Sequence, residues 1–174
     1  MDLIDAIQRR VAVVAIGAST VRGQRTKGVA AAAREFLATV PLKRFGTNSM
    51  QAFHAELDRA TADLEVAFPK KARSWGLARK CMNIFLRDCF YNFYLHKHFD
   101  LDRSKDFHEI PLDKKVAEAL RGKASGLPRW QGVKYLTRNV SDAYQQTAGQ
   151  LAKKWDIERV HLDTFLWTDG IHIS

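Results

Sequence analysis

Apolar residues recur every three or four positions along most of this chain, a spacing that indicates α-helices rather than β-strands. A first helix is predicted for residues 3–15, and two more for residues 29–40 and 47–68. Each of the three is followed closely by a glycine or a proline, which are residues that end helices. The pattern therefore predicts an all-α fold.

The longest predicted helix runs from about Ser74 to His98 and has one continuous apolar stripe. A stripe of this width is typical of a helix that packs against neighbours along its whole length. We expect it to be the central helix of the core. Its stripe consists of Ala78, Cys81, Met82, Phe85, Cys89 and Phe93.

The second half of the chain continues in the same style after a charged connector. Pro111 fits the first turn of a fifth helix. Residues 141–155 predict another helix with Ser141 as its N-cap, and residues 157–167 form a closing element that is either helix or strand. No repeat or linker interrupts the pattern, so we expect one compact helical domain, residues 1–174.

The chain is strongly basic, with 28 Lys and Arg against 19 Asp and Glu and a net charge of +9. An excess of this kind attracts polyanions, and DNA is the first partner we expect. Two glycine-rich basic loops, residues 19–28 and 122–132, are suited to contact phosphates. The competing interpretation is that the charge serves solubility or binds an acidic protein.

No segment is long and apolar enough to span a membrane, and the opening residues carry acids where a signal peptide carries basic residues. We expect a cytoplasmic monomer without a membrane partner. Cys81 and Cys89 stand eight residues apart on one predicted helix, a rise of roughly 12 Å, which is too far for a disulfide. His161 and Asp163 lack the further ligands of a metal site, and no metal or cofactor is expected.

Lys80 is the first candidate for chemistry, because it lies on the flank of the apolar stripe together with Ile84 and Arg87. A lysine attacks as a nucleophile only when it is neutral. Partial burial and the neighbouring Arg79 and Arg87 both favour the neutral form. The competing interpretation is an ordinary solvated surface lysine.

Asp113 is the second candidate. With Pro111 at the first helical position, Asp113 falls in the first turn, where free backbone amides stabilise a carboxylate. The competing interpretation is an acid that only caps the helix.

The stretch "GLARKCMNIFLRDC" followed by "IPLDKKV" resembles the helix-hairpin-helix superfamily of DNA glycosylases. Lys80 and Asp113 fall on the positions of that family's catalytic lysine and aspartate. The insertion "HKHFDLDRSKDFHE" between the two motifs makes the spacing more like the archaeal 8-oxoguanine glycosylase branch. The resemblance covers residues 74–120 and implies a minimal version of the helix-hairpin-helix glycosylase core.

The family's glycine-rich hairpin, which grips the DNA backbone, is replaced here by "PKKARSWGLA". Lys70, Lys71 and Arg73, together with the amides near Gly76, are the candidates for a phosphate site at this helix start.

The resemblance implies a DNA N-glycosylase of base excision, with or without AP-lyase activity, that acts in DNA repair or in antiviral defence. The target nucleotide would be flipped out of the duplex. Asp113 would stabilise the positive charge on the sugar, and Lys80 would attack C1′ to form a Schiff base. In the alternative, Asp113 activates water and Lys80 only binds. The base is either oxidised guanine or a hypermodified phage base such as glucosylated hydroxymethylcytosine.

Aromatic and polar residues near the ends of predicted elements are candidates for the base pocket. Trp75, Trp130 and Trp167 offer flat faces for stacking, with a core position as the competing interpretation. Gln24 carries an amide that can read a base edge, and Asp163 is an acid inside an apolar run.

The expected DNA-binding residues lie in the basic loops and before the lysine helix, and they are Arg22, Arg25, Lys27, Lys70, Lys71, Arg73, Arg129 and Lys134. The alternative to an enzyme is a non-catalytic, basic helical nucleic-acid-binding protein, such as a regulator or an interference factor. A helical protein–protein adaptor is a third hypothesis.

Overall fold

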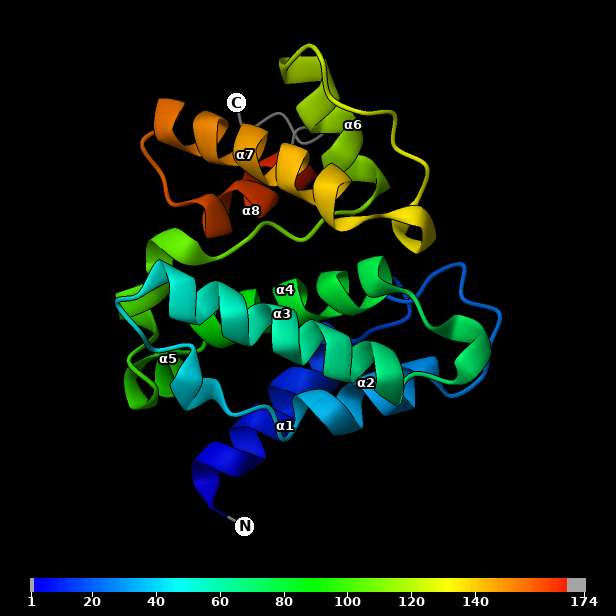
Figure 1. Ribbon diagram of the computed structural model, residues 1–174. Coiled ribbons are helices and arrows are strands. Elements are labelled where there is room, and N and C mark those ends of the chain that lie inside the picture. Colours follow the sequence, from blue (N-terminus) through cyan, green and yellow to red (C-terminus); the bar gives the residue numbers. More distant parts are fainter. Residues whose placement is uncertain (1, 169–174) are drawn as a thin grey trace.

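Helices account for the regular structure of residues 2–168, the part of the chain that the computed structural model describes (Figure 1). No strand occurs among these residues, which confirms the predicted all-α class. The α-helices are α1 (Leu3–Ala15), α2 (Val29–Leu37), α3 (Met50–Ala67), α4 (Trp75–Tyr91), α5 (Phe93–His98), α6 (Lys114–Lys123), α7 (Arg138–Lys154) and α8 (Leu162–Thr168). Short 3₁₀ turns connect them, namely η1 (Leu42–Arg44), η2 (Lys70–Ala72), η3 (Leu101–Phe107), η4 (Val133–Tyr135) and η5 (Arg159–His161).

Most of the α-helices begin at a short polar residue whose side chain accepts a hydrogen bond from a backbone N–H of the first turn. Such a bond satisfies one of the amides that the helix leaves without a partner at this end. The N-cap positions are therefore local sequence signals. The residues that cap in this way are Asp2, Ser49, Ser74, Asn92, Asp113 and Thr137.

The prediction of one long helix from Ser74 to His98 is wrong, because Asn92 divides it. Asn92 has an extended backbone, with φ −82° and ψ 112°, and its side chain accepts from Leu95 N to begin α5. Asparagine competes with the helix for backbone hydrogen bonds and so favours caps over interiors. Phe93, predicted to lie in the core, is 70% exposed beyond this break.

Two predicted helix starts also differ from the structure. Pro111 precedes α6 without belonging to it. Asp113 is the N-cap, since its carboxylate accepts from Val116 N, and the helix begins at Lys114. Thr137, not Ser141, caps α7, and Ser141 is buried inside that helix. The closing element is helical, as one of the two predicted alternatives.

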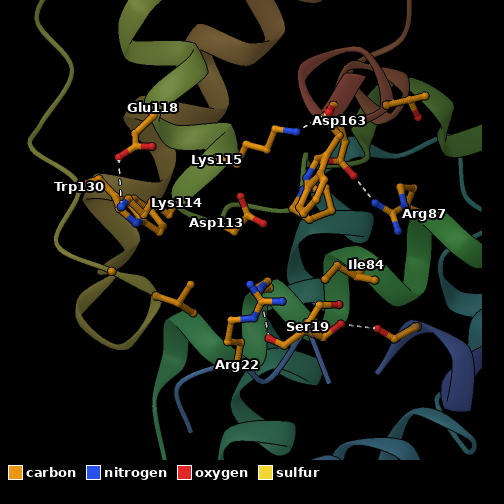
Figure 2. A pocket seen from close by; sticks show the side chains of 18 of the residues that line it. Ser19, Arg22, Ile84, Arg87, Asp113, Lys114, Lys115, Glu118, Trp130 and Asp163 are labelled. Atoms are coloured by element: carbon orange, nitrogen blue, oxygen red, sulfur yellow. Dashed lines mark hydrogen bonds and ion pairs between the residues drawn. The ribbon is translucent and has the colours of Figure 1, made fainter. Parts of the chain in front are cut away.

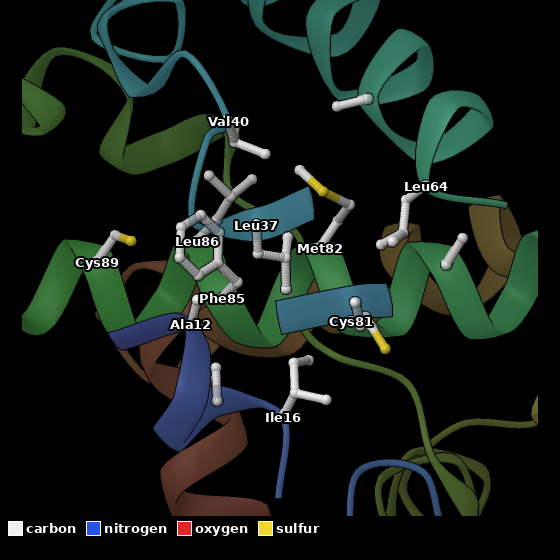
Figure 3. Packing of buried hydrophobic residues seen from close by; sticks show 14 of the residues in the cluster. Ala12, Ile16, Leu37, Val40, Leu64, Cys81, Met82, Phe85, Leu86 and Cys89 are labelled. Carbon is white, nitrogen blue, oxygen red and sulfur yellow. The ribbon is translucent and has the colours of Figure 1, made fainter. Parts of the chain in front are cut away.

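The apolar side chains form two clusters, one in each layer of the molecule. Figure 1 shows α6, α7 and α8 stacked over a layer made of α1 to α5. The larger cluster surrounds α4, where Met82, Phe85 and Leu86 are buried against α1 and α2 (Figure 3). Cys81 and Cys89 are buried free thiols there, as predicted. The smaller cluster packs around Tyr144 in the upper layer.

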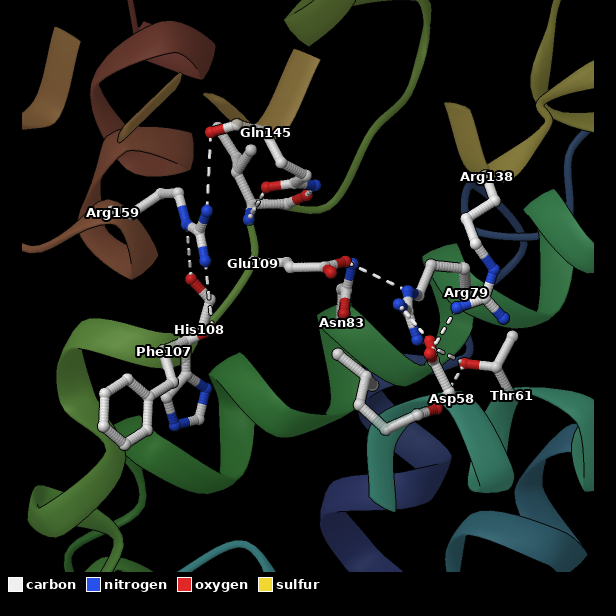
Figure 4. Close-up of polar contacts among 12 residues, drawn as sticks. Asp58, Thr61, Arg79, Asn83, Phe107, His108, Glu109, Arg138, Gln145 and Arg159 are labelled. Carbon is white, nitrogen blue, oxygen red and sulfur yellow. Dashed lines mark hydrogen bonds and ion pairs between the residues drawn. The ribbon is translucent and has the colours of Figure 1, made fainter. Parts of the chain in front are cut away.

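Ion pairs and hydrogen bonds join the two layers (Figure 4). Asp58 on α3 accepts from Arg79 of α4 at 2.7 Å and also from Arg138 at the start of α7. Burial opposes the charge on Asp58, but the two arginines outweigh it and lower the pKa of this carboxyl. The contacts of Asp58 with Arg79 and Arg138 therefore hold α7 over α3 and α4.

A second clamp holds the extended segment that leads to α6. Gln145 of α7 accepts from Ile110 N at 3.0 Å and donates to Ile110 O at 2.8 Å. Arg159 donates to the carbonyls of Phe107 and His108. These contacts set where Asp113 enters the space between the layers. Among the residues that the structure describes, no helix is long and apolar enough to cross a membrane.

Candidate active site

A cavity of about 1340 Å³ lies between the two layers (Figure 2). Its walls come from the end of α1 and the loop after it, the flank of α4, one side of α6, the loop before η4, and α8. Segments far apart in the sequence therefore meet here, and most of the polar groups they bring are charged. These charged residues are Arg22, Lys80, Arg87, Asp88, Asp113, Lys114, Lys115, Glu118, Arg121, Arg129 and Asp163.

The cavity brings some of the residues predicted for the site together and leaves others outside. The predicted residues that line it are Lys80, Asp113, Asp163, Trp167, Arg22 and Arg129. Trp130, considered for stacking, lines it as well. The predicted residues that do not line it are Gln24, Trp75, Arg25, Lys27, Lys70, Lys71, Arg73 and Lys134.

Lys80 lies in the second turn of α4 and is only 8% exposed. Its Nζ donates a hydrogen bond to the carbonyl of Thr20 at 3.0 Å, in the loop after α1. Arg79, its neighbour in sequence, does not line the cavity and pairs with Asp58 and Glu109. The Lys80 side chain is therefore buried beside the cavity, and its amine is held by the Thr20 carbonyl.

Asp113 is the N-cap of α6 and is half-buried. Its carboxylate accepts from Val116 N at 3.0 Å, and Figure 2 shows this side chain across the cavity from Ser19 and Arg22. A carboxylate at this end of a helix is favoured by the helix dipole. The structure therefore explains Asp113 as a capping acid and also places it on the cavity wall.

Asp163 of α8 is a second carboxyl on the same cavity and is 3% exposed. Its Oδ2 pairs with the guanidinium of Arg87, which also binds Asp88, and Figure 2 shows Asp163 facing Arg87. Burial raises the pKa of Asp163, Arg87 acts in the opposite direction, and the charge of Asp113 adds to the rise. Asp163 Oδ1 is buried without a hydrogen-bond partner among the described residues.

Two tryptophans form part of the cavity wall. Trp130 packs edge-on against Tyr144, with ring centroids 5.8 Å apart. Trp167 is half-exposed, and the Lys115 ammonium lies 4.7 Å from the centre of its ring while donating to the Trp167 carbonyl. Both rings line the cavity, and an indole ring can stack with a planar ligand.

Trp75 is held away from the cavity by two guanidinium groups. Arg79 and Arg138 lie 5.2 Å and 5.7 Å from the centre of its indole ring. Cation–π contacts of this kind stabilise a partly buried tryptophan. In this structure Trp75 joins α4 to α7 and does not line the predicted base pocket.

The start of α4, for which the sequence predicts a phosphate site, packs against η4, where Ser74 Oγ donates to the carbonyl of Lys134. Gly76 is buried, and a Cβ placed on it would lie 2.2 Å from the carbonyl oxygen of Val133. Arg73 donates instead to the carbonyls of Val66 and Phe68 at the end of α3. Lys70 and Lys71 are exposed on η2.

Three basic residues of α6 line the cavity although the sequence analysis did not select them: Lys114, Lys115 and Arg121. A signal for them was present. Two lysines in the first turn oppose the helix dipole, which favours acids there. Residues 114, 118 and 121 also share one helix face, so a second basic group on that face could have been expected.

No family model, no curated protein and no solved structure matches this chain. Among the described residues, no group of three or more His, Cys, Asp or Glu side chains could hold a metal ion. The side chains that line the cavity include three lysine amines, four carboxyl groups, four guanidinium groups and two indole rings.

Proposed function

We propose that this protein is a DNA N-glycosylase of the helix-hairpin-helix type that forms a Schiff base with its substrate. The observation that carries the proposal is that Lys80 on α4 and Asp113 at the start of α6 line one cavity. The tryptophans and arginines around them suit a nucleotide that has been flipped out of a duplex.

The chemistry uses the amine and the carboxylate on one deoxyribose. The neutral amine of Lys80 forms a bond to C1′ as the bond from C1′ to the base breaks, and the base leaves with the electron pair. The proton that the nitrogen loses goes to the departing base. The carboxylate of Asp113 stabilises the positive charge that develops on the sugar. The C1′–O4′ bond then breaks and the remaining proton of the nitrogen passes to O4′, which opens the sugar ring and gives the Schiff base.

The basic rim supplies the contact with the DNA backbone. Arg22, Arg121 and Arg129 are exposed, line the cavity and pair with no carboxylate among the described residues. They come from three different segments, so together they can contact phosphates on both sides of the flipped nucleotide. The paired Arg87 lies deeper and holds Asp163 instead.

The base is either an oxidised guanine or a hypermodified base such as glucosylated hydroxymethylcytosine. A cavity of about 1340 Å³ exceeds the roughly 300–1,000 Å³ of most small-molecule sites, so it has room for a nucleotide and a bulky substituent. Repair of oxidised DNA and defence against phages with modified DNA are the matching roles.

The proposal is tested by a mass-spectrometric screen for free bases released from oxidised, genomic and phage DNAs. The parent protein should release one class of base, and the double variant with Lys80→Gln and Asp113→Asn should release none. A parent protein that releases no base from any of these DNAs would overturn the proposal.

The second candidate function is a non-catalytic nucleic-acid-binding protein. The observation in its favour is that both proposed catalytic groups have structural partners, since Lys80 binds the Thr20 carbonyl and Asp113 binds Val116 N. Borohydride trapping on DNA with an abasic site separates the two functions. A covalent adduct that Lys80→Gln removes supports the enzyme, whereas salt-sensitive binding without adduct or base release supports the binder.

A further inference from the structure

We infer that Thr20 is a positioning residue, which fixes the Lys80 amine through its backbone carbonyl. This inference rests on the proposed function. Thr20 is 7% exposed and stands in the turn that follows α1. Its carbonyl oxygen is the acceptor for Lys80 Nζ at 3.0 Å.

The turn around Thr20 is itself fixed at both its side chain and its backbone. Thr20 Oγ1 donates to the carbonyl of Ala15 at 2.8 Å, and Thr20 N donates to the carbonyl of Gly17 at 3.1 Å. Ala15 is the last residue of α1, so its carbonyl has no partner within the helix. The hydroxyl thus connects Thr20 to the rigid end of α1.

A fixed acceptor matters because a lysine side chain has four rotatable bonds and much rotamer entropy. A carbonyl accepts from an ammonium or from a neutral amine alike, and the neutral amine keeps its lone pair free. The bond to Thr20 therefore holds the nitrogen at the cavity wall without consuming the electron pair that attacks C1′. A nucleophile held in place in this way reacts faster than a mobile one.

The same turn also carries a group of the basic rim. Arg22 follows Thr20 by two residues, and its backbone N donates to the carbonyl of Ser19 at 3.4 Å. Ser19, Thr20 and Arg22 all line the cavity. A phosphate bound at Arg22 therefore acts on the segment that holds Lys80, and this links DNA binding to the position of the amine.

The test uses Thr20→Val, which keeps the shape of the side chain but removes the hydroxyl, and Thr20→Ser, which keeps the hydroxyl. The readouts are the single-turnover rate of borohydride-trapped adduct at saturating abasic-site DNA, and the affinity for that DNA. We expect Thr20→Val to lower the rate at least about tenfold with little change in affinity, since a small misplacement of a reacting group is costly. Thr20→Ser should react at close to the parent rate.

Thermal melting of each variant shows that it is folded at the assay temperature, and Thr20→Ala replaces Thr20→Val if the latter does not fold. A hydroxyl-free variant that traps DNA at the parent rate overturns the positioning role while the proposed function stands. A parent protein that neither traps DNA nor releases a base contradicts the proposed function, and the role of Thr20 fails with it. A loss of rate that Thr20→Ser does not restore also overturns the inference.

Discussion

Several polar groups in this protein are buried deeply enough that their protonation affects folding. His108 shows this most clearly, being 2% exposed between the rings of Phe53 and Phe90, whose centroids each lie 5.1 Å from its own. Burial lowers the pKa of His108 to about 3, and the positive charges of Arg159 and of the two nearby histidines act in the same direction. The imidazole is therefore neutral in the folded protein at neutral pH.

His108 should make the protein less stable in mild acid. Its pKa is about 6.5 when unfolded and about 3 when folded, so the unfolded chain binds a proton first as the pH falls. The contribution of the neutral His108 to the free energy of unfolding is fully present above about pH 6.5. It is lost progressively below that pH, and the loss is on the order of 1–2 kcal/mol at about pH 5.

Urea unfolding of the parent and of His108→Phe at the two pH values checks this expectation. The variant should lose less stability than the parent between about pH 7 and about pH 5. Equal losses in the two proteins would mean that His108 is not the group responsible.

At the scale of the helix, Asp113 has two tasks that one substitution cannot separate. Its carboxylate begins α6 through Val116 N and faces the cavity at the same time. Asparagine and aspartate cap helices about equally well, whereas alanine does not. The pair Asp113→Asn and Asp113→Ala therefore separates the charge from the cap.

We predict that Asp113→Ala lowers the free energy of unfolding by about 1 kcal/mol and that Asp113→Asn changes it much less. Chemical denaturation at neutral pH measures both differences. If Asp113→Asn is as destabilised as Asp113→Ala, the charge and not the cap stabilises α6, and Asn is then no neutral control for catalysis.

The sequence predicted the presence and approximate bounds of most helices because their caps and apolar stripes are local features. It failed at Asn92, since the apolar stripe continues to Phe93 and hides the break, although Phe93 is exposed. In the site, the flank position of Lys80 followed from helical spacing. The hydrogen bond from Lys80 to Thr20 could not be predicted, because Thr20 lies 60 residues away in the sequence and its position depends on how α1 packs on α4.

At the scale of the whole molecule, the two layers enclose a cavity whose rim is basic and whose floor holds the paired acid Asp163. A net charge of +9 favours polyanions in general, whereas under the proposed function the rim arginines Arg22, Arg121 and Arg129 lie where a flipped nucleotide would enter. The distribution of charge, rather than its total, is thus expected to decide where the duplex lies.

The salt dependence of DNA binding should report these rim contacts. Arg121→Ala is expected to reduce the slope of log affinity against log salt by about 0.9, the value for one lost phosphate contact on duplex DNA. Arg121→Lys should keep nearly the parent slope, because it keeps the charge. Fluorescence anisotropy at several salt concentrations gives both slopes. An unchanged slope in Arg121→Ala would mean that Arg121 does not contact the DNA backbone.

We propose that Lys80 and Asp113 act together on one deoxyribose in the cavity. The rate of base release in a single turnover, at saturating duplex DNA that carries the base found by screening, tests it most directly. We expect Lys80→Gln and Asp113→Asn each to bind this duplex like the parent and to release base at least about a hundredfold more slowly. Release at the parent rate by both variants would contradict it.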